Sequence, residues 1–167
     1  MNKILSQGLF FLFLLCLQVF ILNNINFLGY INPYLYIAFI FLYPLEENKF
    51  PLLFLSFILG ISIDFFSDSG GIHAFSTILI AYTRLFFVRV YFRKIPSDYP
   101  FFKLKSESIG KVFNYVVTLT LIHHFIYFSF ASFSFQNLSI VLLNTLYSST
   151  FTFILFFLGT YIFKKSK

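Results

Sequence analysis

Residues 60–74 have the sequence Gly-Ile-Ser-Ile-Asp-Phe-Phe-Ser-Asp-Ser-Gly-Gly-Ile-His-Ala, and they lie between two long apolar runs. The stretch contains two carboxylates, Asp64 and Asp68, and one histidine, His73. Ionisable side chains are costly at membrane depth, so their presence there marks a functional or structural site. Gly70 and Gly71 can both adopt positive φ without steric cost. The sequence therefore predicts a polar hairpin between two helices, and we expect function to reside there.

The surrounding chain is too apolar for a water-soluble domain. It is 59% hydrophobic and 11% charged, with a mean hydropathy of +0.85. A membrane-spanning helix needs about 20 mostly apolar residues. We therefore predict an all-α, polytopic integral membrane bundle of about six transmembrane helices in a single domain over residues 1–167. The predicted spans are 4–22, 33–45, 51–66, 73–92, 112–133 and 138–163; because the second and third are short, five spans remain an alternative.

The distribution of Lys and Arg predicts the topology. Connections 23–32, 67–72 and 134–137 contain none of the twelve, whereas ten occupy the other loops and the two ends of the chain. Cytoplasmic loops retain basic residues, so both termini are predicted to be cytoplasmic. The net charge of +6 is thereby explained by topology, with a contribution from anionic lipid, and no nucleic-acid partner is expected. The single cysteine, Cys16, excludes an internal disulfide.

Polar and small residues recur at helical spacing on five of the predicted spans. Such stripes typically mark the packed faces of membrane helices, and a water-filled cavity is the alternative. We expect Asn32 to cap the second span ahead of Pro33. The stripes are Asn32, Tyr36 and Tyr43; Ser56, Gly60 and Asp64; His73, Thr77, Ala81 and Arg84; Thr120, His124 and Tyr127, with His123 beside them; and Asn144, Ser148 and Thr152.

Arg84 is the most expensive of these residues, since a mid-span arginine is disfavoured by roughly 2.5–3.5 kcal/mol and normally faces a protein partner. Asp64 is the nearest acid in sequence, but it lies too far along the hairpin for a simple contact. Asp68 would share a helical face with Asp64 and repel it if the helix continued. Either the helix therefore ends near Phe66, or one of the two acids finds a cation or takes a capping role. For Asp68 we expect an N-cap or an Asx turn at the start of the fourth span.

Catalytic patterns are missing from the sequence. It contains neither a His-Glu-x-x-His zinc motif nor a Gly-x-Ser-x-Gly nucleophile. Adjacent His123 and His124 point about 100° apart on a helix, which disfavours joint binding of one ion. Asp64 and Asp68 lack the surrounding pattern of lipid-head-group phosphotransferases. We therefore expect no enzyme activity, no metal and no cofactor.

The hairpin resembles the signature region of the bacterial rod-shape-determining MreD family. The matching positions are Gly60, Asp64, Gly71, His73 and Ala74, with Asp68 and Gly70 inside the motif. Residues 17–19 and 22–36 are similar to the first hairpin of that family, and the length and six-span pattern agree over the full chain. The resemblance implies that the motif residues shape the bundle and its partner surface.

The resemblance also implies location and partners. It predicts a non-enzymatic component of the elongation machinery in the bacterial inner membrane. Its partners there would be an MreC-type scaffold, the glycosyltransferase and transpeptidase pair that builds lateral peptidoglycan, and indirectly the actin-like MreB.

The alternative function is the substrate-binding membrane subunit of an energy-coupling-factor transporter, another six-helix bundle. Residues 4–22 lack the Ala-x-x-x-Ala face by which such subunits dock. A retained small-molecule or lipid pocket would lie around Arg84, His123 and His124. We expect these three residues and Asn144 to be buried polar residues of the bundle.

Overall fold

The computed structural model describes residues 3–26, 31–132 and 138–164, and its regular elements are helices. Five of them are long and apolar enough to cross a membrane, and their bounds agree closely with five of the predicted spans. The long helices are α1 (Lys3–Phe20), α3 (Phe50–Ser67), α4 (Ile72–Phe92), α5 (Ile109–Ser132) and α6 (Leu138–Lys164). The short ones are α2 (Ala38–Leu42) and the 3-10 helices η1 (Leu22–Asn24), η2 (Leu35–Ile37), η3 (Pro96–Phe101) and η4 (Leu104–Ser106).

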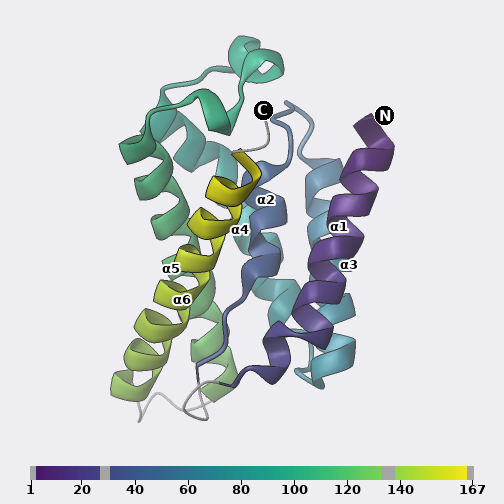
Figure 1. The fold of residues 1–167 in the computed structure, drawn as a ribbon, viewed down its shortest axis with the longest axis vertical. Coiled ribbons are helices and arrows are strands. Elements are labelled where there is room, and N and C mark those ends of the chain that lie inside the picture. Colours follow the sequence, from purple (N-terminus) through teal and green to yellow (C-terminus); the bar gives the residue numbers. More distant parts are fainter. Residues whose placement is uncertain (1–2, 27–30, 133–137, 165–167) are drawn as a thin grey trace.

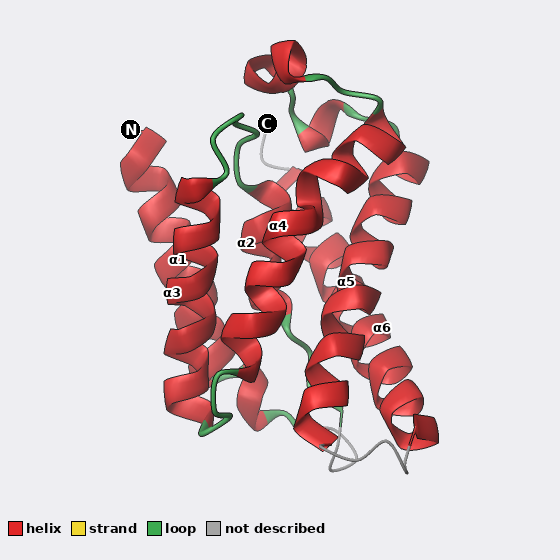
Figure 2. Cartoon of the chain, turned by 180° about the vertical axis from the view of Figure 1, so that it is seen from behind, coloured by secondary structure: helices red, strands yellow, loops and turns green. Residues whose placement is uncertain are grey.

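The long helices stand side by side around a central segment. α1 packs against α3, α3 against α4, α4 against α5, and α5 against α6. Figure 1 shows α2 between α1 and α6, and from the opposite side α4 covers it (Figure 2). The start of α1 and the end of α6 lie at the same end of the bundle, together with the loop that carries η3 and η4 (Figure 1).

The outer surface of the bundle is apolar, whereas many polar side chains lie inside it. Ile4, Phe50 and Phe65 are 76%, 70% and 81% exposed, while Gln18 and Arg84 are almost completely buried. This arrangement suits a lipid environment, in which apolar side chains face hydrocarbon and polar groups must find partners within the protein. The chain is thus a multi-pass membrane protein with a helical bundle.

The predicted helix over residues 33–45 is wrong in its conformation. Only η2 and α2 are helical there, and Asn32 does not cap a helix because Tyr34 precedes η2. The segment still passes from one end of the bundle to the other (Figure 1). Thirteen residues in an α-helix would span about 20 Å, which is less than the roughly 30 Å of a hydrocarbon core. Non-helical backbone on both sides of η2 and α2 makes up the length, because it covers about 3.3 Å per residue.

Candidate functional site

The motif residues meet at the junction between α3 and α4. One carboxylate oxygen of Asp64 accepts hydrogen bonds from the backbone N–H of His73 (2.9 Å) and the hydroxyl of Ser69 (2.6 Å), and the other accepts from the N–H of Ala74 (2.8 Å). His73 and Ala74 belong to the first turn of α4, whose N-cap position is occupied by Gly71 and offers no side-chain oxygen. Asp64 therefore supplies from α3 the cap that α4 lacks, at the positive end of the helix dipole.

Gly60 brings the two helices close enough for this cap. A Cβ atom added at Gly60 would lie 2.4 Å from Cα of Ala74, 2.7 Å from its N and 2.9 Å from the carbonyl oxygen of His73. These are backbone atoms of α4, so they cannot move aside as a flexible side chain would. Since Asp64 follows Gly60 by one helical turn on the same face, the missing side chain at position 60 places the carboxylate against the start of α4.

The turn between α3 and α4 uses three residues in the left-handed region. Gly70 has φ 64° and Gly71 has φ 93°, as expected of a glycine pair in a sharp turn. Asp68 has φ 51° and is the C-cap of α3, with its N–H bonded to the carbonyl of Asp64. The expectation that Asp68 caps α4 is wrong, because the tertiary contact of Asp64 already fills that role.

The central segment, residues 31–45, carries backbone groups that no helix satisfies, and neighbouring helices supply the partners. Buried Gln18 of α1 donates to the carbonyl of Pro33 (2.9 Å) and accepts from the N–H of Tyr36 (3.3 Å). Thr152 of α6 accepts from the N–H of Tyr34 (2.9 Å). Irregular backbone at membrane depth is tolerated only when such partners exist.

Arg84 satisfies the other end of the same segment. Its guanidinium donates to the carbonyl oxygens of Tyr43 and Pro44 (3.3 Å for Pro44), and its Nε donates to the hydroxyl of Tyr115 (3.3 Å). Asp64 is bound at the junction and is not its partner. The charge of Arg84 therefore lies against the C-terminal, electronegative end of α2.

Tyr36 links the central segment to α4 and α5. Its hydroxyl lies 2.9 Å from Nδ1 of His73 and 2.8 Å from Nε2 of His123. A phenolic hydroxyl can donate to one of these rings and accept from the other. Nδ1 of His123 is buried without a hydrogen-bond partner among the described residues. His124 turns away from this contact: its Nδ1 lies 2.8 Å from the carbonyl of Thr120 and its Nε2 lies 3.0 Å from the hydroxyl of Thr152.

Most of the predicted polar stripe residues face the bundle interior. Asn144, which was expected to be buried, is only half-buried, whereas Ser148 and Thr152 on the same helix are buried. Asn32, Tyr43 and Tyr127 are half-buried as well. Gln18 and Tyr115 are buried polar residues to which the sequence patterns assign no role. An amide within the apolar second half of the first helix was the available signal for Gln18. No local pattern distinguishes Tyr115 from the many other aromatic residues.

The chemistry of these side chains is that of structural hydrogen bonding. In the described part of the chain, no group of three or more His, Cys, Asp or Glu side chains is placed to hold a metal ion. Comparison with known proteins found no matching family model, no matching curated protein and no matching solved structure. The function is therefore inferred from the hydrogen bonds at the α3–α4 junction and along the central segment.

Proposed function

We propose that this chain is a non-enzymatic component of the bacterial cell-elongation machinery, which supports lateral peptidoglycan synthesis and cell shape through contacts between membrane helices. The observation that carries the proposal is the engagement of Asp64, the acid of the MreD-like motif. Its carboxylate accepts three hydrogen bonds from the protein itself, two of them from the first turn of α4. A carboxylate engaged in this way shapes a bundle and is poorly placed to act as a base or metal ligand.

The partners proposed from the resemblance are an MreC-type scaffold and the elongation glycosyltransferase and transpeptidase pair, with MreB contacted indirectly. Apart from residues 93–108, the described connections outside the long helices and the central segment are short. Partners would therefore contact the lipid-facing sides of the helices or the rims of the bundle. Gly60, Asp64 and Gly71 would act indirectly, by fixing the relative position of α3 and α4.

We place the chain in the inner membrane with six crossings and both termini in the cytoplasm. Residues 31–45 supply the sixth crossing in this proposal, since they connect the two ends of the bundle (Figure 1). The basic loop 93–108 lies at the same end as the start of α1 and the end of α6. Basic residues favour the cytoplasmic side of a membrane.

A reporter enzyme that is active only in the periplasm tests this topology. We expect it to be inactive when fused after Lys167 and active when fused within the turn at Ser69, because an even number of crossings separates the first site from a cytoplasmic N-terminus. Activity of the Lys167 fusion would mean an odd number of crossings and would contradict the proposal.

Co-purification from the native cells tests the function. We expect the tagged protein, extracted in mild detergent, to recover the MreC-type scaffold and the wall-synthesis pair, as identified by mass spectrometry. Asp64→Asn should reduce this recovery several-fold and impair rod shape while the protein remains inserted, because hydrogen bonds to a charged group are worth about 1.5–3 kcal/mol each. Insertion depends on span hydropathy, which the change barely alters.

Glu47→Gln is the control, since it removes one carboxylate charge at an exposed position outside the hairpin motif. It should leave partner recovery and cell shape unchanged. Normal rods at normal expression with Asp64→Asn would show that the motif acid is dispensable. Recovery of transporter ATPases and a coupling subunit, without wall proteins, would favour the energy-coupling-factor alternative.

A further inference from the structure

A groove of about 600 Å³ lies on the open side of the bundle, between α1 and α6. Its floor is formed by residues of η2 and α2, and its walls by bulky apolar side chains. Leu42, Phe156, Thr160 and Lys105 also line an adjoining hollow of about 340 Å³. The two volumes fall within the range typical of small-molecule and lipid sites. The residues that line the groove include Phe10, Phe13, Leu14, Leu35, Ala38 and Leu155.

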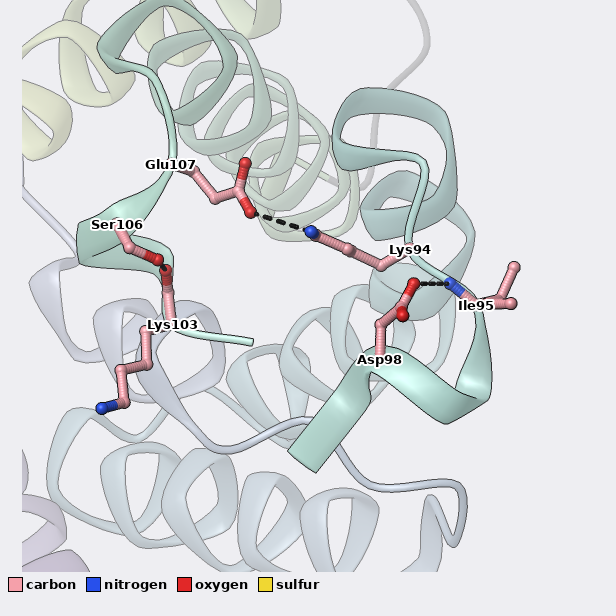
Figure 3. A network of polar contacts seen from close by, with 6 residues as sticks. All are labelled: Lys94, Ile95, Asp98, Lys103, Ser106 and Glu107. Atoms are coloured by element: carbon pink, nitrogen blue, oxygen red, sulfur yellow. Dashed lines mark hydrogen bonds and ion pairs between the residues drawn. The ribbon is translucent and has the colours of Figure 1, made fainter. Parts of the chain in front are cut away.

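Among the described residues that line the groove, Lys105 is the one that carries a charge. It lies in η4, in a loop whose conformation is fixed by polar contacts (Figure 3). Lys94 and Glu107 form an ion pair (3.4 Å), and Asp98 accepts a hydrogen bond from the N–H of Ile95 (3.2 Å). Glu107 borders the adjoining hollow, but Lys94 balances its charge, so Lys105 leaves the rim of the groove positive.

We propose that the groove binds an acyl chain of an anionic phospholipid, with the lipid phosphate held by the ammonium group of Lys105. The charge of Lys105 complements the phosphate, and it lies at the end of the bundle where basic residues gather. Anionic lipids of the cytoplasmic leaflet are attracted to basic segments at this level of the membrane. The inference depends on membrane embedding and not on the proposed role in cell elongation.

The shape of the groove favours an acyl chain over a helix of a partner protein. Membrane helices associate through contiguous small residues and interhelical hydrogen bonds. Among the residues that line the groove, the small ones are Ala38, Gly159 and Thr160, and no two of them are four residues apart on one helix. The rest of the lining is largely Phe and Leu. A flexible acyl chain can fill such an irregular apolar surface, whereas a helix would need a complementary ridge.

Quenching of a single introduced tryptophan by brominated lipids tests the proposal, since the chain contains no tryptophan of its own. Phe13→Trp places the probe in the groove, and Phe57→Trp places it on the exposed face of α3 outside the groove. Each full-length variant is reconstituted in phosphatidylcholine vesicles containing phosphatidylglycerol, with either lipid brominated. We expect phosphatidylglycerol to be preferred about fivefold at position 13, which is the effect of about 1 kcal/mol from one Lys near an anionic lipid, and not at position 57.

Charge reversals at two exposed lysines of the same loop complete the design. Lys105→Glu should abolish the preference at position 13, whereas Lys103→Glu, which lies outside the groove lining, should preserve it. Equal quenching by both lipids at both positions would overturn the proposal, as would a preference that survives Lys105→Glu or is lost with Lys103→Glu. Absence of lipid quenching at position 13, with normal quenching at position 57, would show that protein covers the groove and would also overturn it.

Discussion

Arg84→Met is expected to lower the free energy of unfolding of the bundle by about 3 kcal/mol or more, although the variant should insert normally. The substitution leaves the carbonyl oxygens of Tyr43 and Pro44 without their donor. A hydrogen bond from a charged donor is worth about 1.5–3 kcal/mol. The buried Arg84 makes such bonds to both carbonyls and to the hydroxyl of Tyr115. Insertion of α4 should become easier by roughly 2.5–3.5 kcal/mol, because the mid-span charge is gone. The two effects therefore oppose each other.

Unfolding in a detergent titration separates the effects, because it compares folded and unfolded chains after insertion. Arg89→Met is the matched control, because Arg89 lies in the last turn of the same helix and is exposed. Among the described residues, its side chain makes one long contact, with the hydroxyl of Tyr99 (3.5 Å). It should change stability by no more than about 0.5 kcal/mol. Arg84→Lys should give an intermediate loss, because an ammonium group lacks the planar fork of guanidinium. Equal stability of the two Met variants would contradict the assigned role.

The sequence predicts the five long helices well because each is a long apolar run with clear ends. Pro51 and Gly71 mark the starts of α3 and α4. The remaining spans are separated by connections, some rich in Lys and Arg and others without either residue. The helix predicted over residues 33–45 is wrong because apolar composition alone does not determine conformation. The conformation of this segment depends on the distance that it must cover from one end of the bundle to the other. The segment is too short to cross as a helix, so its backbone partly unwinds, and this requires donors and acceptors from other helices.

The contacts of the polar residues were less predictable than their burial. Helical spacing places Gly60 and Asp64 on one face, and His73 and Arg84 on another, without showing what they touch. The partners of Arg84 are backbone carbonyls about forty positions earlier in the chain, and any residue type can provide a carbonyl. Likewise, the cap of α4 comes from Asp64 because the first turn of α4 packs against Gly60, a tertiary fact that capping preferences do not include.

Gly60→Ala is expected to destabilise the bundle by about 2–3 kcal/mol, even though alanine is the better helix former by roughly 1 kcal/mol. The added methyl group would overlap Cα and N of Ala74, so α3 and α4 must separate. The separation would also withdraw Asp64 from the N–H groups of His73 and Ala74. Gly8→Ala is the control, since a Cβ atom there meets nothing within 4 Å. It should be neutral or slightly stabilising in the same unfolding measurement.

A double-mutant cycle between positions 60 and 64 tests whether the cap that Asp64 provides to α4 depends on the close approach of α3 and α4 at Gly60. Asp64→Asn should cost about 1–3 kcal/mol in the wild-type background, because a carboxylate at a helix N-terminus is replaced by an uncharged amide. In the Gly60→Ala background the same change should cost much less, since the cap is already broken; residues in contact typically show such non-additivity. Additive costs would mean that Gly60 and Asp64 stabilise the junction independently. A Gly60→Ala variant as stable as Gly8→Ala would instead show that the helices can separate without penalty.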